Sequence, residues 1–191
     1  MLGALRNFRP SFLALTNSPH TFRPSPAPAL GRDPEGGKVL GILGMGGIGR
    51  NFVRKCRPFD MKVIYHNRRR LADPALEEGA TYVSFEEVLK QSDILSVHVP
   101  LNEHTRHLLG KKELAMCKKG VCIVNTARGA VIDEAALVEA LESEQVGSVG
   151  LDVFEEEPKV HEGLLKNERA FLLPHMEQRR RRHKSRWKNG V

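Results

Sequence analysis

The stretch KVLGILGMGGIGRNF, from Lys38 to Phe52, decides the fold class of this 191-residue chain. Its first six residues form a short apolar run broken only by glycine, which is typical of a buried strand. The glycines that follow match the pattern G-x-G-x-x-G, and Ile48 and Phe52 continue at helical spacing towards Pro58. A strand, a glycine-rich turn and a helix in this order favour a dinucleotide-binding unit over a glycine-rich turn without a ligand.

Each glycine of this turn has an expected task. Gly44 permits the tight turn, Gly46 lets the backbone approach a pyrophosphate, and Gly49 allows the helix to pack closely on the strand. The main-chain amides at the helix N-terminus, which includes Gly47 and Ile48, are expected to donate to the anion.

Strand-like and helical segments alternate after this unit. Short apolar runs predict strands over residues 61–65, 93–99, 119–126, 146–153 and 170–173. Ser84 and Glu87 form a capping-box pattern at the start of a helix over 84–91, and Asp133 is the expected N-cap of a helix over 133–143. Such alternation predicts an α/β fold with a doubly wound parallel sheet, a Rossmann-type domain whose ligands lie at the carboxyl ends of the strands.

The second predicted strand ends in an unusual way for a dinucleotide-binding domain. The fingerprint usually places an acid about 20 residues after the glycines, where it binds the ribose 2′-hydroxyl. Here that position reads Asn67, Arg68 and Arg69, and no carboxylate follows until Asp73. We expect Asn67 and Arg68 at the ribose, with Arg68 or Arg69 able to pair with a 2′-phosphate. This favours NADP(H) over NAD(H), the alternative being that the arginines only face solvent.

Four later motifs resemble those of the D-isomer-specific 2-hydroxyacid dehydrogenases. They are HVPL (His98–Leu101) with Thr105 after it, VNTARGAVID (Val124–Asp133), GLDVFEEEP (Gly150–Pro158) and LLPH (Leu172–His175). The resemblance covers about residues 38–176 and is closest to the glyoxylate/hydroxypyruvate reductase-like branch. It implies an NAD(P)-dependent oxidoreductase, often a homodimer, that acts on the CH–OH group of 2-hydroxy acids and reduces small 2-oxo acids such as glyoxylate or hydroxypyruvate.

The resemblance also implies site residues. Arg128 is expected to hold the substrate carboxylate, His175 to transfer the proton, and Glu157 to orient His175 and favour its protonated form. Cofactor-binding positions implied in the same way are Val99, Pro100, Thr105, Thr126, Ala127 and Asp152. The chemistry agrees, since a guanidinium fits a carboxylate bidentately and an imidazole beside a carboxylate is a proton donor near neutral pH. Taken singly, each residue also has an ordinary structural interpretation.

The chain departs from the family pattern at both ends. We expect residues 1–37 to hold the end of an interdomain helix and a proline-rich linker, residues 38–176 the dinucleotide-binding domain, and residues 177–191 a disordered basic tail. In the family a substrate domain precedes the cofactor domain, and most of it is missing from this pattern. The alternative function is therefore a catalytically impaired NAD(P)-binding module that senses cofactor or binds a partner.

The basic charge is confined to the end of the sequence. The chain carries 30 Lys+Arg and 23 Asp+Glu, a formal net charge of +7, of which residues 177–191 contribute +6. The nearly neutral remainder argues against nucleic-acid binding by the body, because such binding needs a basic face. Polyanion binding by the tail is a weaker alternative.

The cysteines and the hydropathy of the sequence indicate where in the cell the protein is expected. Cys56, Cys117 and Cys122 show neither metal-ligand spacing nor an even-numbered framework, so we expect no metal site and buried thiols in a reducing, cytoplasmic location. We also find no apolar run long enough for a membrane span or a signal peptide.

Overall fold

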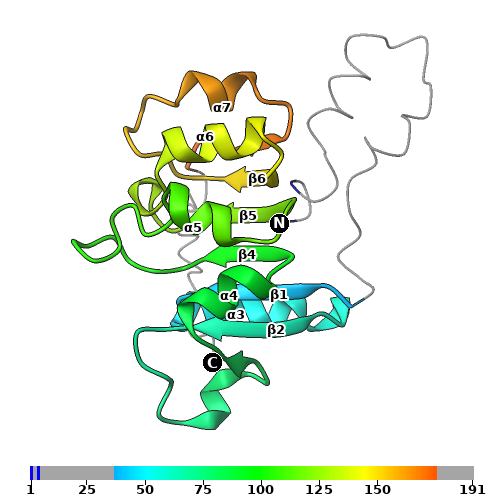
Figure 1. Cartoon of the computed structure of the whole chain (residues 1–191). Helices are drawn as coiled ribbons and strands as arrows, with labels where there is room; N and C mark the ends of the chain where they lie inside the picture. The colour runs from blue at the N-terminus through cyan, green and yellow to red at the C-terminus, as the bar shows by residue number, and fades with distance from the viewer. Residues whose placement is uncertain (2–3, 5–36, 176–191) are drawn as a thin grey trace, which may run out of the picture.

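The computed structural model describes Met1, Ala4 and residues 37–175, which form a seven-stranded sheet in the order β3-β2-β1-β4-β5-β6-β7 (Figure 1). Every neighbouring pair of strands is parallel. The strand bounds are β1 (Val39–Leu43), β2 (Lys62–His66), β3 (Thr81–Tyr82), β4 (Ile94–Val97), β5 (Val121–Asn125), β6 (Val146–Leu151) and β7 (Ala170–Leu172). The order runs outward from β1 on one side and from β4 on the other, so the winding reverses between these two strands.

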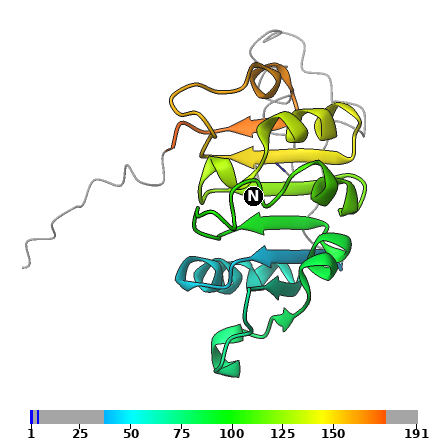
Figure 2. The same cartoon turned by 60° about the vertical axis from the view of Figure 1, so that its left-hand side comes forward.

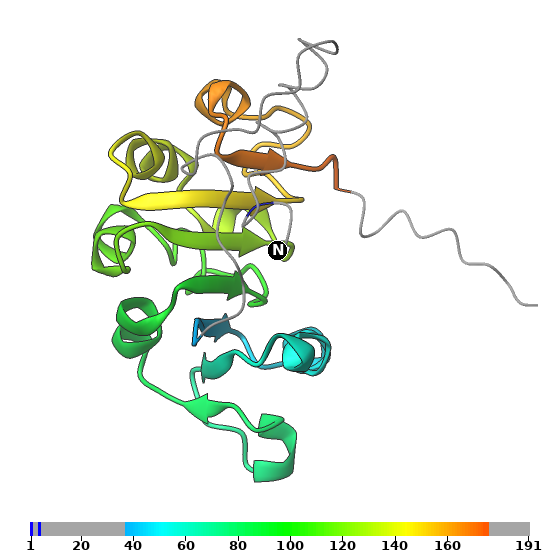
Figure 3. The same ribbon diagram turned by 90° about the vertical axis from the view of Figure 1, so that its right-hand side faces the viewer.

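Helices cover both faces of the sheet. The α-helices are α3 (Gly47–Cys56), α4 (Phe85–Gln91), α5 (Lys111–Met116), α6 (Glu134–Glu142) and α7 (Glu162–Lys166), and three 3₁₀ turns are η2 (Arg57–Phe59), η3 (Pro74–Glu77) and η4 (Gly129–Val131). Figure 3 shows α4, α5 and α6 on one face and α3 on the other. The predicted doubly wound parallel sheet is therefore confirmed.

The core is divided into two layers by the sheet. On one side, Leu40 and Ile42 of β1 pack with Val53 of α3. On the other, Leu95 of β4 packs with Leu137 of α6 in a cluster that also contains residues of α4 and α5. Because both faces are covered, the central strands are apolar almost throughout rather than alternating with polar residues.

Local signals placed the longer helices correctly. Ser84 Oγ accepts from the Glu87 amide at 3.2 Å while Glu87 Oε2 accepts from the Ser84 amide at 2.8 Å, so the predicted capping box is confirmed. Asp133 Oδ1 accepts from the Ala136 amide at 3.0 Å, as expected of an N-cap. The sequence did not predict β3, α5 or α7, which have two, six and five residues and are too short to show a periodic pattern.

The two ends of the chain are only partly described. Ala4 is buried, and its methyl group lies next to Gly150 of β6. The other expectations for residues 5–36 and for the tail 177–191 lie outside the described residues. Within the described part, no helix combines the length and the apolar character that crossing a membrane requires. The expectation of buried thiols is confirmed, since Cys56, Cys117 and Cys122 are all buried.

The turn between β1 and α3 depends on close approaches of the backbone. Gly44 has φ of +99°, and a Cβ atom there would lie 2.8 Å from the carbonyl carbon of His98. A Cβ atom on Gly49 would overlap the carbonyl oxygen of Gly44. At Gly46 and Gly47 an added Cβ atom would meet nothing within 4 Å. Two glycines are thus required by packing, and two face open space.

His98, just after β4, is a partly buried histidine. Its ring centroid lies 5.5 Å from that of Phe52, and its Nε2 lies 2.9 Å from Ser96 Oγ. Burial lowers the pKa of His98 from 6.5 to about 4, so the folded protein holds this imidazole neutral near neutral pH.

We predict that Gly49→Ala lowers the free energy of unfolding by about 1–3 kcal/mol, because backbone must move to admit the methyl group. Gly46→Ala is the matched control and should leave stability almost unchanged, since its φ of −81° suits alanine and its surroundings are open. Urea denaturation of both variants measures the difference. Equal destabilisation by the two substitutions would contradict this account of the turn.

We predict a loss of stability as the pH falls from about 6.5 to about 4, caused by His98. In that window the unfolded chain binds a proton at this residue that the folded chain does not, which costs up to about 3 kcal/mol of stability. Denaturation at a series of pH values should give a shallower slope for His98→Gln, which cannot titrate. His104→Gln, whose parent side chain is 72% exposed, should keep the native slope. An unchanged slope for His98→Gln would refute the assignment.

Candidate active site

The expected site residues follow the carboxyl ends of six strands. Because all the strands are parallel, these ends lie along one edge of the sheet, towards which the arrows point in Figure 2. In strand order along the chain, the residues are Gly44 after β1, Asn67 after β2, Val99 after β4, Arg128 after β5, Glu157 after β6 and His175 after β7. One edge therefore carries both the cofactor-binding and the catalytic residues expected from the sequence.

A cleft with a volume of about 620 Å³ opens at this edge, beside the ends of β1, β2 and β4. The point where the strand order reverses is where ligands of doubly wound sheets bind. Seven expected cofactor-binding residues line it, namely Gly44, Gly46, Asn67, Arg68, Val99, Pro100 and Thr105. Further lining residues that the sequence did not single out include Met45, Leu71, Phe85, Asn102, His104 and Leu108.

The glycine turn is anchored to the end of β2. The Gly44 amide donates to the His66 carbonyl at 3.0 Å, and the Met45 amide donates to Asn67 Oδ1 at 2.6 Å. The side chain of Asn67 thus holds the turn in place. The open sides of Gly46 and Gly47 leave room for a phosphate to reach the backbone, so this turn fits a dinucleotide.

The three consecutive arginines at the end of β2 have different surroundings. Arg70 binds both carboxylate oxygens of Glu77, at 2.7 and 3.2 Å, and Tyr65 donates to Glu77 at 2.7 Å. Hydrogen bonds from Arg70 and Tyr65 lower the pKa of Glu77 despite an opposing effect of burial. Arg68 and Arg69 are exposed and line the cleft. Two of the three guanidinium groups are therefore accessible to a ligand at the cleft.

Thr105 shapes the segment that borders the cleft. Its hydroxyl donates to the Pro100 carbonyl at 2.6 Å and accepts from the Asn102 amide at 2.8 Å.

Six other expected cofactor-binding residues do not line the cleft: Gly47, Ile48, Gly49, Thr126, Ala127 and Asp152. Of these, Ile48 is 61% exposed at the start of α3, whereas Asp152 is 4% exposed at the end of β6.

Glu157 and His175 lie in direct contact. His175 Nδ1 is 2.7 Å from Glu157 Oε2, and Glu157 Oε1 accepts from the Phe154 amide at 3.0 Å. Burial would raise the pKa of Glu157, but the hydrogen bonds from His175 and Phe154 and the charges of His175 and Arg128 outweigh it, so this pKa is lowered. The carboxylate therefore stays ionised beside the imidazole.

The loop that carries Arg128 is held by hydrogen bonds from Asn125 and by close packing at Gly129. The buried side chain of Asn125 accepts from the Ala127 amide and donates to the Arg128 carbonyl, both at 2.9 Å. Gly129 packs against the main chain of Phe154, where a Cβ atom would overlap the Phe154 carbonyl. The Arg128 side chain itself is exposed, with Nη1 donating to the Ala127 carbonyl at 2.6 Å. The sequence contained Asn125 and Gly129 within a quoted motif, but gave no signal of these contacts.

Known proteins are similar to this chain in sequence. Residues 1–177 match the family described as D-isomer specific 2-hydroxyacid dehydrogenase, NAD binding domain. A 4-methyl-2-oxopentanoate reductase A from Aspergillus oryzae is 59% identical over 147 residues, which is 77% of this chain and 44% of that protein. Glyoxylate reductase 1 from Saccharomyces cerevisiae is 51% identical over 180 residues, 92% of this chain and 50% of that protein.

Solved structures agree with these relatives. The crystal structure of a glyoxylate reductase from Paecilomyes thermophila superposes with a TM-score of 0.84 at 57% identity, over 92% of this chain and 52% of that one. The chain thus spans about half the length of the relatives it matches. With the family match, the parallel sheet and the cleft at its reversal point, the chain belongs to the D-isomer-specific 2-hydroxyacid dehydrogenases, of which it carries the nicotinamide-cofactor-binding domain.

Proposed function

We propose that this chain is the cofactor-binding part of an oxidoreductase that reduces a small 2-oxo acid, such as glyoxylate or hydroxypyruvate, with NADPH. The observation that carries the proposal is the 2.7 Å contact between His175 and an ionised Glu157, on the sheet edge that also bears Arg128. A proton donor, its orienting carboxylate and a carboxylate-binding cation are what reduction of a 2-oxo acid requires. The relatives named as glyoxylate reductases support the same substrate class.

Each of the three proposed catalytic residues has a separate role in the reaction. The nicotinamide, when bound, supplies the hydride. Arg128 binds the substrate carboxylate, for which its planar, permanently charged guanidinium is suited. Glu157 engages Nδ1 of His175, so Nε2 carries the proton that goes to the keto oxygen. The hydrogen bond between Nδ1 and Glu157 fixes the plane of the ring.

The exposed arginines of the cleft support the preference for NADPH. A 2′-phosphate beside Arg68 and Arg69 would gain charge-assisted hydrogen bonds, and no acid of the HNRRR segment would repel it. Arg70 is excluded from this role because Glu77 binds it. Val99, Pro100, Thr105, Thr126, Ala127 and Asp152 complete the proposed cofactor-binding set.

The location, the oligomeric state and the domain bounds are further proposals. Three buried cysteines favour a reducing, cytoplasmic location, and the family resemblance favours a homodimer. We also retain the division at residues 37 and 176 between linker, cofactor-binding domain and tail. The alternative of a cofactor sensor or partner-binding module without catalysis has no observation in its favour.

We predict that Arg68→Ala and Arg69→Ala weaken NADPH binding selectively, each by about 1.5–3 kcal/mol where the contact to the phosphate is direct. NADH, which lacks the 2′-phosphate, is the matched control ligand and should bind each variant as it binds the native chain. Calorimetric titration with both cofactors measures the difference. Equal affinity of the native chain for NADPH and NADH would rule out the preference.

We predict that His175→Ala lowers the rate of reduction by about 10²–10⁴-fold, because it removes the proton donor, with little change in cofactor affinity. Arg128→Ala should raise KM and lower kcat together, because it removes both substrate binding and alignment. The assay uses NADPH with glyoxylate or hydroxypyruvate. Because Arg128 is exposed and His175 partly exposed to solvent here, the chain is first joined to the remaining half of the Saccharomyces relative. An active enzyme that tolerates both substitutions would contradict the proposed function.

A further inference from the structure

Glu155 contacts a segment that is remote in sequence. Its Oε1 atom lies 3.2 Å from Arg106 Nη2 and 2.5 Å from His107 Nε2. The Glu155 side chain is only 18% exposed, while those of Arg106 and His107 are 59% and 40% exposed. Since Arg106 and His107 directly follow Thr105, one carboxylate joins the border of the cofactor cleft to the loop that carries Glu157.

The segment after Thr105 is also bound to the loop that follows Arg128. The His107 amide donates to the Ala130 carbonyl at 2.8 Å, and the Leu109 amide donates to the Val131 carbonyl at 3.1 Å. This segment is therefore fixed along its length, and it gives Glu155 a rigid surface to bind.

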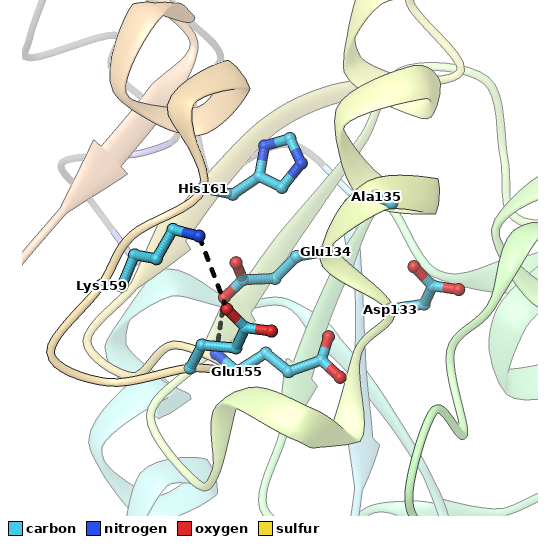
Figure 4. A pocket seen from close by; sticks show the side chains of 7 residues that line it. Asp133, Glu134, Ala135, Glu155, Lys159 and His161 are labelled. Carbon is cyan, nitrogen blue, oxygen red and sulfur yellow. Dashed lines mark hydrogen bonds and ion pairs between the residues drawn. The ribbon is translucent and has the colours of Figure 1, made fainter.

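A second carboxylate holds the main chain of the same residue. Glu134, at the start of α6, is 8% exposed, and its Oε1 accepts from the Glu155 amide at 2.7 Å. Figure 4 shows the Glu134 side chain directed from α6 towards the loop of Glu155, beside a pocket of about 320 Å³ that Lys159 and His161 also line. Burial, with a smaller effect of the Glu155 charge, raises the pKa of Glu134. The loop is thus held through both the main chain and the side chain of Glu155.

We propose that Glu155 is a positioning residue, which fixes the loop of residues 154–157 against the cleft segment so that Glu157 meets His175. The inference rests on the proposed function for the meaning of the Glu157–His175 pair, but not for its geometry. An ion pair this close to the surface adds little to stability, so its value lies in placement. Without it, the loop would be free to carry Glu157 away from His175.

Removing the Glu155 carboxylate would change the pKa of Glu157 through two effects of opposite sign. Through space, loss of a negative charge two residues away makes ionisation of Glu157 easier and lowers its pKa. Through position, loss of the contact with His175 makes ionisation harder and raises that pKa. The direction of the change therefore distinguishes a positioning residue from a neighbouring charge.

The Phe154 amide provides the signal, because it donates to Glu157 and its proton resonance reports the ionisation of that carboxylate. The resonance is followed by ¹⁵N–¹H NMR from about pH 7 to pH 3 in the 191-residue chain. For Glu155→Ala we expect the midpoint to rise by about 0.5–1 pH unit relative to the native chain. Glu156→Ala is the matched control, since its parent side chain is 75% exposed and pairs only loosely with Lys159 at 3.8 Å, and it should leave the midpoint unchanged or lower it.

Glu155→Gln keeps the shape of the side chain and decides the matter if Glu155→Ala does not fold. It should raise the midpoint less than alanine does, because the amide oxygen still accepts a hydrogen bond from Arg106. A midpoint that falls or stays constant in the folded Glu155 variants, as in Glu156→Ala, would overturn the proposal. The measurement needs neither cofactor nor substrate, so a failure here leaves the proposed function intact, and absence of turnover would leave this result intact.

Discussion

The site depends first on the close backbone approach at Gly44. With φ of +99° and no side chain, Gly44 brings the end of β1 against His98 after β4, while its amide donates to the carbonyl of His66, the last residue of β2. Gly49 then lets α3 begin directly beneath the Gly44 carbonyl. Three strand ends and one helix N-terminus thus converge on one turn. The cleft lies where these strand ends separate, with the open side of Gly46 along it.

A second close approach, at Gly129, organises the part of the site that carries Glu157 and His175 in the same way. Because Gly129 has no side chain, the loop after β5 packs on the main chain of Phe154 after β6. Asn125 then shapes the turn that presents Arg128, and the Phe154 amide binds Glu157. Arg128 comes close enough to lower the pKa of Glu157 through its charge. An ionised carboxylate beside an imidazole results from how two loops pack rather than from any single residue.

Charged residues around the site fall into two groups. Arg70 is bound by Glu77, and Arg106 by Glu155, so these guanidinium groups hold loops together. Arg68, Arg69 and Arg128 are exposed at the edge of the sheet, where a ligand can reach them. The distinction matters because a guanidinium that already binds a carboxylate is less available to a phosphate.

The sequence by itself determined the fold class and the order of the site residues. Glycine spacing, apolar runs and two N-caps are local signals, and in a parallel sheet they are enough to assign Gly44, Asn67, Arg128, Glu157 and His175 to one edge. It could not determine β3, α5 or α7, whose few residues are held by packing against the sheet rather than by their own periodicity. Nor could the sequence show that Arg70 rather than Arg68, or Glu155 rather than Glu156, forms a close ion pair. That depends on which residues the fold places next to each of them. Glu77 lies seven residues from Arg70, and Arg106 lies 49 residues from Glu155, so the tertiary structure alone decided which charges are paired and which remain available to a ligand.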